Sequence, residues 1–439
     1  MGLIMSEKMQ ILLDITPLKN AFYANSSRSG IFFTLKNILF ELLKRPDIEL
    51  FFYISEGEFM VRDVLSREFP EYSERILNRC LIRCKYPSAV NEHFKVIARL
   101  KEHFAGHKII HFCLRGYNFF LRHICQLFFR GEYSNFNLPN NIHFLSLMYS
   151  PDNYIKNNIP ADRCYLLLYD LIPKHFPEYA YLLDSSHIDG WLGDVVKNLS
   201  AEENYMAISD ATRKDFLLHY PVLSAKDISV IHLAAAAYFK PVTDCREFEK
   251  VSKKYNIPRD KKIFYSCCSL APHKNLERLF RAFAAFHKNN SDWVIIFSGA
   301  EMGAKKDLIY QIAEENDMPE TAFSFIGYVD DEELPILYSL ADVFCFVSLY
   351  EGFGLPVLEA MQCGCPCLIS NTSSLPEIAG DAALQVSPTD IDDIVSGMCK
   401  LAGNESLRQE MSKVGLLHAK EFSWSKTTDC IMNALKNNN

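Results

Sequence analysis

A regular alternation of short apolar strands with amphipathic helices constrains this chain most, and it occurs twice. In the first half we predict strands at 10–14, 49–54, 164–170 and 204–209 and a helix at 31–44. The second half has predicted strands at 262–268, 293–298, 322–326, 343–347 and 366–370, and helices that begin near 276, 304, 332, 356 and 391. This pattern predicts an α/β chain with two Rossmann-like domains, each a parallel sheet covered on both faces.

The boundary between the two alternations is expected near 238–243, where Phe239-Lys240-Pro241 should end a strand that begins at Asp227. We therefore expect an N-terminal domain at 1–238 and a C-terminal domain at 239–422. A C-terminal helix at 423–439, which begins around Trp424, should follow them. Open parallel sheets bind ligands at the carboxyl ends of their strands. A ligand is thus expected in the cleft between the domains.

Composition excludes several other classes of protein. The chain has 439 residues, of which 49% are hydrophobic and 23% charged, so it can bury two cores. No apolar run reaches the roughly 18 residues of a membrane-spanning helix. Residues 1–10 lack the basic and apolar regions of a secretory signal, which favours a cytoplasmic location. The cysteines, including Cys363, Cys365 and Cys367, occur in apolar segments and are expected to be reduced and buried, without zinc.

Charge is distributed unevenly along the chain. The net charge is −8, which argues against nucleic acid as a partner, yet residues 75–130 contain eleven Lys and Arg against two Glu. This basic block therefore carries +9 and the remainder −17. It also contains interleaved phenylalanines, a pattern that suits peripheral contact with an anionic membrane, at the cytoplasmic face of the inner membrane, or with an acceptor. A solvated helical face explains the block equally well.

The most informative segment is Tyr350-Glu351-Gly-Phe-Gly-Leu-Pro356-Val-Leu-Glu359-Ala-Met, which directly follows a predicted strand. Its glycines allow close approach of a ligand, Pro356 suits the start of a helix, and the exposed amides there attract an anion. Glu351 and Glu359 could both accept hydrogen bonds from vicinal hydroxyls of a sugar or ribose. Taken alone, the two glutamates could equally be a loop cap and a favourable charge at the helix N-terminus.

Two further segments follow predicted strands. Leu270-Ala-Pro-His273-Lys274-Asn275 places Lys274 at a strand-to-helix turn, where a cation can neutralise a diphosphate leaving group. Ser370-Asn371-Thr-Ser-Ser-Leu-Pro376-Glu377-Ile-Ala-Gly380 lies at another carboxyl end.

Together these motifs resemble the retaining glycosyltransferases of family four, whose signature is Glu-x7-Glu preceded by a Pro-Arg/His-Lys-Asn turn. The resemblance runs from about 264 to 383, and weaker matches extend back through Ile208-Ser-Asp-Ala-Thr-Arg-Lys-Asp215 and Tyr169-Asp-Leu-Ile-Pro173 to Arg28-Ser29-Gly30. It implies a GT-B fold in which the N-terminal domain binds the acceptor and the C-terminal domain binds a nucleotide sugar.

The resemblance also implies a role for each matching residue. Glu351 would contact the donor sugar, Glu359 the ribose hydroxyls, and Lys274 the donor diphosphate, assisted by His273. The amides of Gly352, Phe353, Gly354 and Leu355 would support sugar and phosphate, Tyr328 and Val329 would lie beside the base, and Gly30 would let the first loop close over the phosphates. The implied catalytic residues are Glu351, Lys274 and Tyr169, with no metal and no cofactor. Retention of configuration would follow from front-face displacement, in which a donor phosphate oxygen takes the acceptor proton.

Three departures from the family pattern affect these roles. Tyr169 stands where many relatives have His, and a phenol can hydrogen-bond but cannot be protonated at neutral pH. Cys267-Cys268 replaces Gly-Arg, so His273 or Arg28 would have to compensate for a missing cation. The first loop reads Gly30-Ile-Phe-Phe, which should make it stiffer.

The forms Tyr169-Asp-Leu-Ile-Pro and Pro-His-Lys-Asn are similar to those of bacterial O-antigen and capsule mannosyltransferases. We therefore expect a retaining hexosyltransferase that moves a sugar, mannose in the leading hypothesis, from a nucleotide donor such as GDP-mannose to a cell-surface glycan or lipid-linked saccharide. The departures motivate an alternative, a non-catalytic GT-B subunit that binds a glycan or a partner protein. An epimerase or phosphorylase on the same fold is a third reading.

Overall fold

The computed structural model describes residues 8–22, 30–55, 58–82, 138–177, 191–224, 227–267, 271–299 and 303–437, together with residues 96 and 100. Almost all of the basic block at 75–130, and with it the predicted membrane contact, lies outside these residues, as do Arg28 and Cys268. Within the described ranges, no helix is both long and apolar enough to cross a bilayer.

The first half forms a parallel seven-stranded sheet in the order β3-β2-β1-β4-β5-β6-β7. Its strands are β1 (Met9–Asp14), β2 (Ile48–Ile54), β3 (Cys80–Ile82), β4 (Ile142–Ser146), β5 (Cys164–Leu168), β6 (Asn204–Ala207) and β7 (Ser229–Val230). The helices of this half are α1 (Gly30–Leu43), α2 (Glu58–Glu68), α3 (Ser73–Leu77), α6 (Asn153–Asn158), α7 (Ile172–His175), α9 (Trp191–Lys197) and α10 (Asp210–His219).

The second half forms a parallel six-stranded sheet in the order β10-β9-β8-β11-β12-β13. Its strands are β8 (Lys262–Cys267), β9 (Trp293–Ser298), β10 (Phe323–Gly327), β11 (Val343–Phe346), β12 (Cys367–Ser370) and β13 (Ala383–Val386). The helices are α11 (Cys245–Tyr255), α12 (Leu276–His287), α13 (Gly303–Glu315), α14 (Leu334–Leu340), α15 (Leu355–Gln362), α16 (Leu375–Ala379), α17 (Ile391–Ala402), α18 (Glu405–His418) and α19 (Trp424–Asn437).

Helices cover both faces of the second sheet. Along β8, Phe264 packs into one buried cluster, while Ile263 and Tyr265 pack into another on the opposite face. Side chains of a strand alternate between faces, so a run that is apolar throughout is buried on both. The sequence prediction of two Rossmann-like α/β domains is confirmed.

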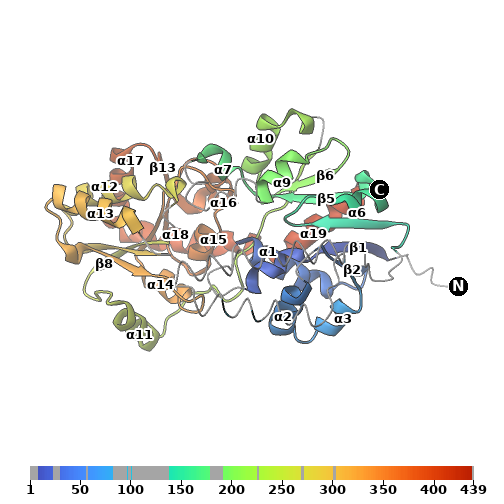
Figure 1. Cartoon of the computed structure of the whole chain (residues 1–439). Helices are drawn as coiled ribbons and strands as arrows, with labels where there is room; N and C mark the ends of the chain where they lie inside the picture. Colours follow the sequence, from blue (N-terminus) through green and yellow to red (C-terminus); the bar gives the residue numbers. More distant parts are fainter. Residues whose placement is uncertain are drawn as a thin grey trace.

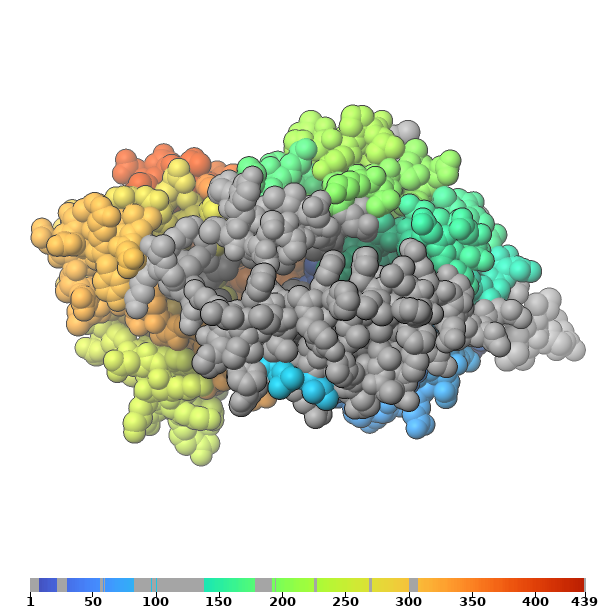
Figure 2. All heavy atoms as spheres, in the orientation of Figure 1, coloured from blue at the N-terminus to red at the C-terminus, as the bar shows by residue number. Residues whose placement is uncertain are grey.

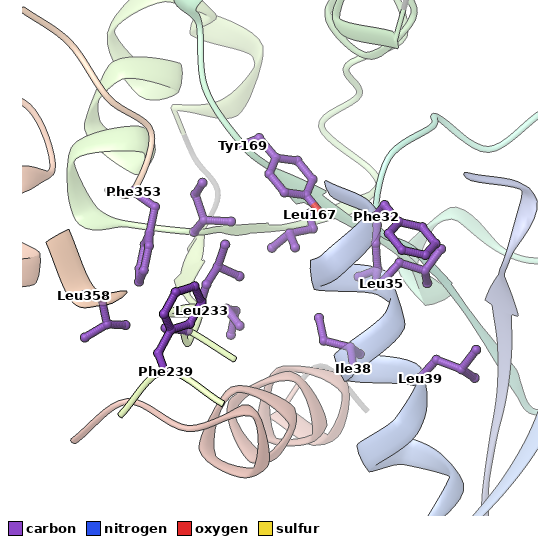
Figure 3. Close-up of a cluster of buried hydrophobic side chains, with 14 of the residues drawn as sticks. Phe32, Leu35, Ile38, Leu39, Leu167, Tyr169, Leu233, Phe239, Phe353 and Leu358 are labelled. Atoms are coloured by element: carbon purple, nitrogen blue, oxygen red, sulfur yellow. The ribbon is translucent and has the colours of Figure 1, made fainter. Parts of the chain in front are cut away.

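The two halves lie side by side (Figures 1 and 2). One cluster of buried apolar residues, the shared core, includes side chains from both halves. In the face shown in Figure 2, the second half occupies one end of the molecule and the first half the other. Figure 3 shows Phe32 and Tyr169 of the first half in a cluster with Phe353 and Leu358 of the second, and all four belong to a single set of contacting buried residues. Burial of apolar surface between the halves therefore holds them together.

The C-terminal helix α19 returns to the first half and packs against α1 (Figure 1). Thr427 Oγ1 donates a hydrogen bond to the carbonyl oxygen of His232, and Arg45 pairs with Asp429. The expected boundary at 238–239 falls in the segment between β7 and α11, which has no regular secondary structure.

One predicted element is wrong. The strand expected from Asp227 to Phe239 is only the two residues of β7, and the backbone that follows is irregular. Its apolar residues, including Ile231 and Leu233, are buried in the shared core, so their hydrophobicity reflects packing between the halves instead of a strand.

Candidate active site

The candidate site lies where the strand order of the second sheet reverses direction. β8 is flanked by β9 and β11, so the segments that follow β8 and β11 diverge to opposite faces, and open parallel sheets bind ligands at such a switch point. The turn η6 (Pro272–Lys274) follows β8, and the loop 347–354 follows β11. Both predicted motifs are therefore brought to the same edge of the sheet.

Lys274 and Glu351 form an ion pair at this switch point. Lys274 Nζ lies 2.7 Å from Glu351 Oε1, and the two side chains are 17% and 9% exposed. Lys274 Nζ also lies 4.7 Å from the centre of the Phe346 ring. The restricted access to water strengthens the attraction and places one cation and one carboxylate side by side, facing the first half.

Asn275 fixes the turn that carries Lys274. Its backbone is left-handed, with a φ of 57°, and its Nδ2 donates to the carbonyl oxygens of Val347 at 3.0 Å and Pro388 at 2.6 Å. The amide of Leu349 donates to the carbonyl oxygen of His273 at 2.7 Å. The bonds with Val347 and Leu349 tie the turn after β8 to the loop after β11, and the bond to Pro388 ties it to the segment after β13. His273 in this turn is buried.

Two serines that the sequence analysis did not single out hold the backbone of Glu351. Ser373 Oγ accepts from the Glu351 amide at 3.1 Å and donates to its carbonyl oxygen at 2.5 Å. Ser374 Oγ donates to the carbonyl oxygens of Glu351 and Phe353 at 3.0 and 2.8 Å. The signal in the sequence was the polar run 370–374 after β12, because hydroxyls after a buried strand commonly bond to a neighbouring loop.

The glycines of the motif permit close contacts on both sides. A Cβ at Gly352 would stand 2.8 Å from the carbonyl oxygen of Tyr169, and one at Gly354, where φ is +108°, would stand 2.5 Å from Leu375 Cδ2. Gly30, at the start of α1, lies beside Leu355 at the start of α15, since a Cβ there would be 3.9 Å from Leu355 Cδ1. Small residues thus bring the first domain against the loop that carries Glu351.

Glu359 lies on α15 and is partly buried. Tyr338 donates a hydrogen bond from its hydroxyl to Glu359 Oε2 at 3.0 Å. Burial raises the pKa of Glu359 to about 7, although the bond from Tyr338 acts in the opposite direction. Both protonation states of this carboxyl group are therefore accessible near neutral pH. The carboxylate can accept hydrogen bonds from a pair of hydroxyls, and the protonated form can also donate one.

Tyr169 is placed differently from the other predicted residues. It follows β5, is 5% exposed, and directs its hydroxyl toward α1 within the apolar cluster of Figure 3. Burial raises its pKa, while a hydrogen bond involving Thr34 lowers it. Its side chain belongs to the core between the domains, and its backbone carbonyl is the group that approaches Gly352.

The remaining predicted residues differ in exposure. Tyr328 is 54% exposed, whereas Val329 and Phe353 are buried in the shared core. The side chains of Val329 and Phe353 therefore pack beneath the site in the shared core, and only the backbone of these residues can contact a ligand. Cys267 is partly exposed at the end of β8 next to Glu359, and burial raises its pKa to about 11, so it is a neutral thiol.

The first domain contacts this loop through hydroxyl groups at the start of α10. Ser209 Oγ donates to the carbonyl oxygen of Gly352 at 2.7 Å. Thr212 Oγ1 lies 2.8 Å from the carbonyl oxygen of Tyr169 and 3.1 Å from that of Gly352. Asp170 lies on the same side, and burial raises its pKa to about 6, with Glu351 and Asp215 raising it further and Lys274 lowering it.

Glu377 of α16 adds a second connection between the domains. Its carboxylate accepts from the amides of Asp210 and Ala211 at 2.8 and 3.2 Å, and it lies 2.7 Å from His232 Nε2. Burial raises the pKa of Glu377, but the hydrogen bonds from His232 and the two amides outweigh it, and the pKa is lowered. The sequence singles out the segment but not this role, because the partners of Glu377 lie 145 to 167 residues earlier in the chain.

The arrangement combines groups that suit an anionic, hydroxylated ligand. Lys274 and the amides at the start of α15 offer positive charge, and Glu351 and Glu359 offer acceptors for hydroxyl groups. A nucleoside diphosphate linked to a sugar presents these features together. Ser209 and Thr212 of the first domain contact this loop at Gly352.

Comparisons with known proteins identify relatives of this chain. A family model described as glycosyl transferases group 1 matches residues 247–416. O-antigen chain mannosyltransferase B of Escherichia coli is 31% identical over 299 residues, which are 66% of this chain and 74% of that protein. The serotype-specific mannosyltransferase WbdA of Escherichia coli is 26% identical over 294 residues, and the match spans 66% of this chain but only 36% of WbdA.

Solved structures share the fold over nearly the whole length. A glycosyltransferase from Rickettsia africae ESF-5 aligns with a TM-score of 0.62 at 15% identity, covering 98% of this chain and 99% of that one. Anabaena HepE, solved in complex with UDP and glucose, aligns with a TM-score of 0.57 at 14% identity, covering 98% and 100%. The expected GT-B fold is confirmed by these likenesses and by the two parallel sheets. On the combined match of family model, curated relative and fold, the chain belongs to the group 1 glycosyltransferases.

Proposed function

We propose that this glycosyltransferase is a retaining mannosyltransferase that uses GDP-mannose and extends a saccharide or lipid-linked saccharide of the O-antigen type. The observation that carries the proposal is the Lys274–Glu351 pair at the switch point of the second sheet, opposite the first domain. The choice of mannose is supported by relatives that are named mannosyltransferases.

In this proposal the diphosphate of the donor takes the position next to Lys274 and the N-terminus of α15. Lys274 Nζ, now paired with Glu351, would share its charge with the departing phosphate. Glu351 would orient the sugar, and Glu359 would accept from the ribose hydroxyls. Tyr328, which is exposed, would lie beside the base, with the backbone of Val329 and the amides 352–355 completing the donor site.

The transfer itself would proceed on one face of the sugar. The acceptor oxygen bonds to the anomeric carbon as the bond from that carbon to the phosphate oxygen breaks, and the acceptor proton passes to the departing phosphate. Lys274 stabilises the charge that develops on the diphosphate, so the step requires neither a metal ion nor a cofactor. The product would keep the anomeric configuration of the donor, which nuclear magnetic resonance of the first product formed can establish.

Tyr169 has a supporting role in this proposal. Its side chain is part of the buried cluster and its carbonyl oxygen contacts the loop that carries Glu351. It would therefore help position that loop, without transferring a proton. We further propose that the enzyme works at the cytoplasmic face of the inner membrane, where lipid-linked acceptors would be available.

A thermal-shift panel tests the donor assignment. The purified protein is heated with GDP, UDP, dTDP and the corresponding sugars, in parallel with the Glu359→Ala variant. Selective binding stabilises the native state by mass action, by about 2.7 kcal/mol at a hundredfold excess over Kd. We expect GDP and GDP-mannose to raise Tm in the wild type and not in the variant. A larger shift with UDP or dTDP compounds would overturn the choice of GDP, and no shift with any nucleotide would favour the non-catalytic subunit.

A further inference from the structure

A cluster of two histidines and an aspartate lies beside the candidate active site and has no part in the proposed chemistry. His175 ends the short helix α7, and Asp215 and His219 are one turn apart on α10. Residues four apart on a helix lie on the same face, so Asp215 and His219 point in one direction, toward the end of α7.

The ligand atoms of the three side chains lie close together. His175 Nε2 lies 2.8 Å from Asp215 Oδ2, and His219 Nε2 lies 3.3 Å from Asp215 Oδ1. One ligand atom from each residue lies within 4.8 Å of the others. The donor atoms of a tetrahedral zinc site, with bonds of 2.0–2.1 Å, are about 3.3 Å apart, so a small movement of the imidazole rings would enclose an ion.

The composition of the cluster suits a transition metal better than calcium or magnesium. Two imidazole nitrogens and one carboxylate oxygen form a set that binds zinc or cobalt, whereas the harder ions prefer oxygen ligands alone. The side chains of His175, Asp215 and His219 are 31%, 12% and 28% exposed, which leaves an open side for a water molecule as the fourth ligand.

A fourth residue connects the cluster to the active site. The Tyr350 hydroxyl donates to Asp215 Oδ2 at 2.7 Å and accepts from the amide of Leu171 at 3.3 Å, and its ring lies 4.7 Å from that of His175. Tyr350 directly precedes Glu351. A hydrogen bond of this kind to a ligating carboxylate orients it and strengthens metal binding.

We propose that His175, Asp215 and His219 form a binding site for one divalent transition-metal ion, with Tyr350 hydrogen-bonded to the ligating carboxylate. The ion does not enter the transfer reaction. It joins α7 to α10 and, through Tyr350, holds the loop 347–354 against the first domain.

Cobalt binding to the untagged full-length protein tests this directly, in the absence of nucleotide. We expect one Co²⁺ per chain with the visible absorption of a four- or five-coordinate ion, displaced by one equivalent of Zn²⁺, and a higher Tm in the presence of either metal.

Substitutions distinguish metal binding at this cluster from binding at other histidines of the chain. His175→Gln and His219→Gln should each abolish the stoichiometric absorption, and Tyr350→Phe should weaken binding about tenfold. His232→Gln is the matched control, because it removes a histidine that pairs with a carboxylate, Glu377, at the same domain interface. Absence of stoichiometric Co²⁺ binding in the wild type, or binding that persists in both cluster variants, would overturn the proposal.

Discussion

Gly354 has a backbone conformation that other residues rarely adopt, with φ at +108°, and Leu375 leaves no room for a side chain there. We expect Gly354→Ala to lower the free energy of unfolding by about 2–4 kcal/mol, since strain and overpacking add together. Denaturant titration measures this change in the free energy of unfolding. Gly364→Ala is the control, because φ there is also positive but the nearest side-chain atom would be 3.2 Å away, and about 1 kcal/mol is expected. Equal losses in the two variants would contradict the role of Leu375.

Glu359 should make stability depend on pH. Its folded-state pKa of about 7 lies above the ordinary 4.5, so the folded state favours the protonated form. The stability that comes from the protonated group is complete below pH 4.5 and is lost as pH rises through 7. The Glu359→Gln variant should therefore match the wild type near pH 4.5 and be more stable by about 1–2 kcal/mol at pH 8. A difference that is the same at both pH values would contradict the assignment.

At the scale of elements, α19 depends on burial for its place on α1. Ile431 is fully buried in the shared core, and its replacement by alanine should cost about 2–4 kcal/mol. Asn433→Ala, on the exposed face of the same helix, should change stability by less than about 0.5 kcal/mol. Chemical denaturation compares the two variants.

Truncation before Trp424 should destabilise both halves, because it removes α19 from its place against α1. An unchanged melting curve would show that α19 is dispensable.

The strands that could be predicted from the sequence were the ones with unbroken apolar runs. β9 and the start of α12 agree with prediction to the residue, and β8 and β12 to within one. β4 escaped prediction because His143 interrupts its apolar run, although the ring is buried. β3 has only three residues, which is too short for a periodic signal, and β13 is half exposed. These three strands form because of packing in the folded chain, which their local sequence does not reveal.

At the scale of the whole molecule, Glu377 should govern how firmly the domains stay together. The Glu377→Gln variant loses a charge that the amides of Asp210 and Ala211 and the ring of His232 stabilise. We expect hydrogen exchange across 209–213 to become several-fold faster at pH 7. The stability that Glu377 contributes is present above pH 4.5 and falls as pH drops through its lowered pKa. Glu405→Gln, which changes an exposed glutamate at the start of α18, is the control. Unchanged protection of 209–213 in the Glu377 variant would contradict the role of Glu377 in holding the domains together.

The candidate site divides into a part that local motifs predict and a part that only the fold supplies. Lys274 and Glu351 follow neighbouring strands, so their meeting follows from the rule on carboxyl ends. The burial of the Tyr169 side chain and the contacts of Ser209 with Gly352 and of Tyr350 with Asp215 could not be predicted, because they arise between domains that are distant in sequence. Local motifs do not show how the two domains are oriented relative to each other.

Mannosyl transfer by the Lys274→Met variant tests the central claim most directly. Lys262→Met is the matched control, because Lys262 also pairs with a carboxylate, Asp342, but lies at the start of β8, at the end of the strand away from the turn that carries Lys274. With GDP-mannose and a lipid-linked saccharide, we predict that the rate falls at least a hundredfold, about 3 kcal/mol of transition-state stabilisation, in Lys274→Met and stays within twofold in Lys262→Met. A folded Lys274→Met protein that transfers mannose at nearly the wild-type rate would contradict the account.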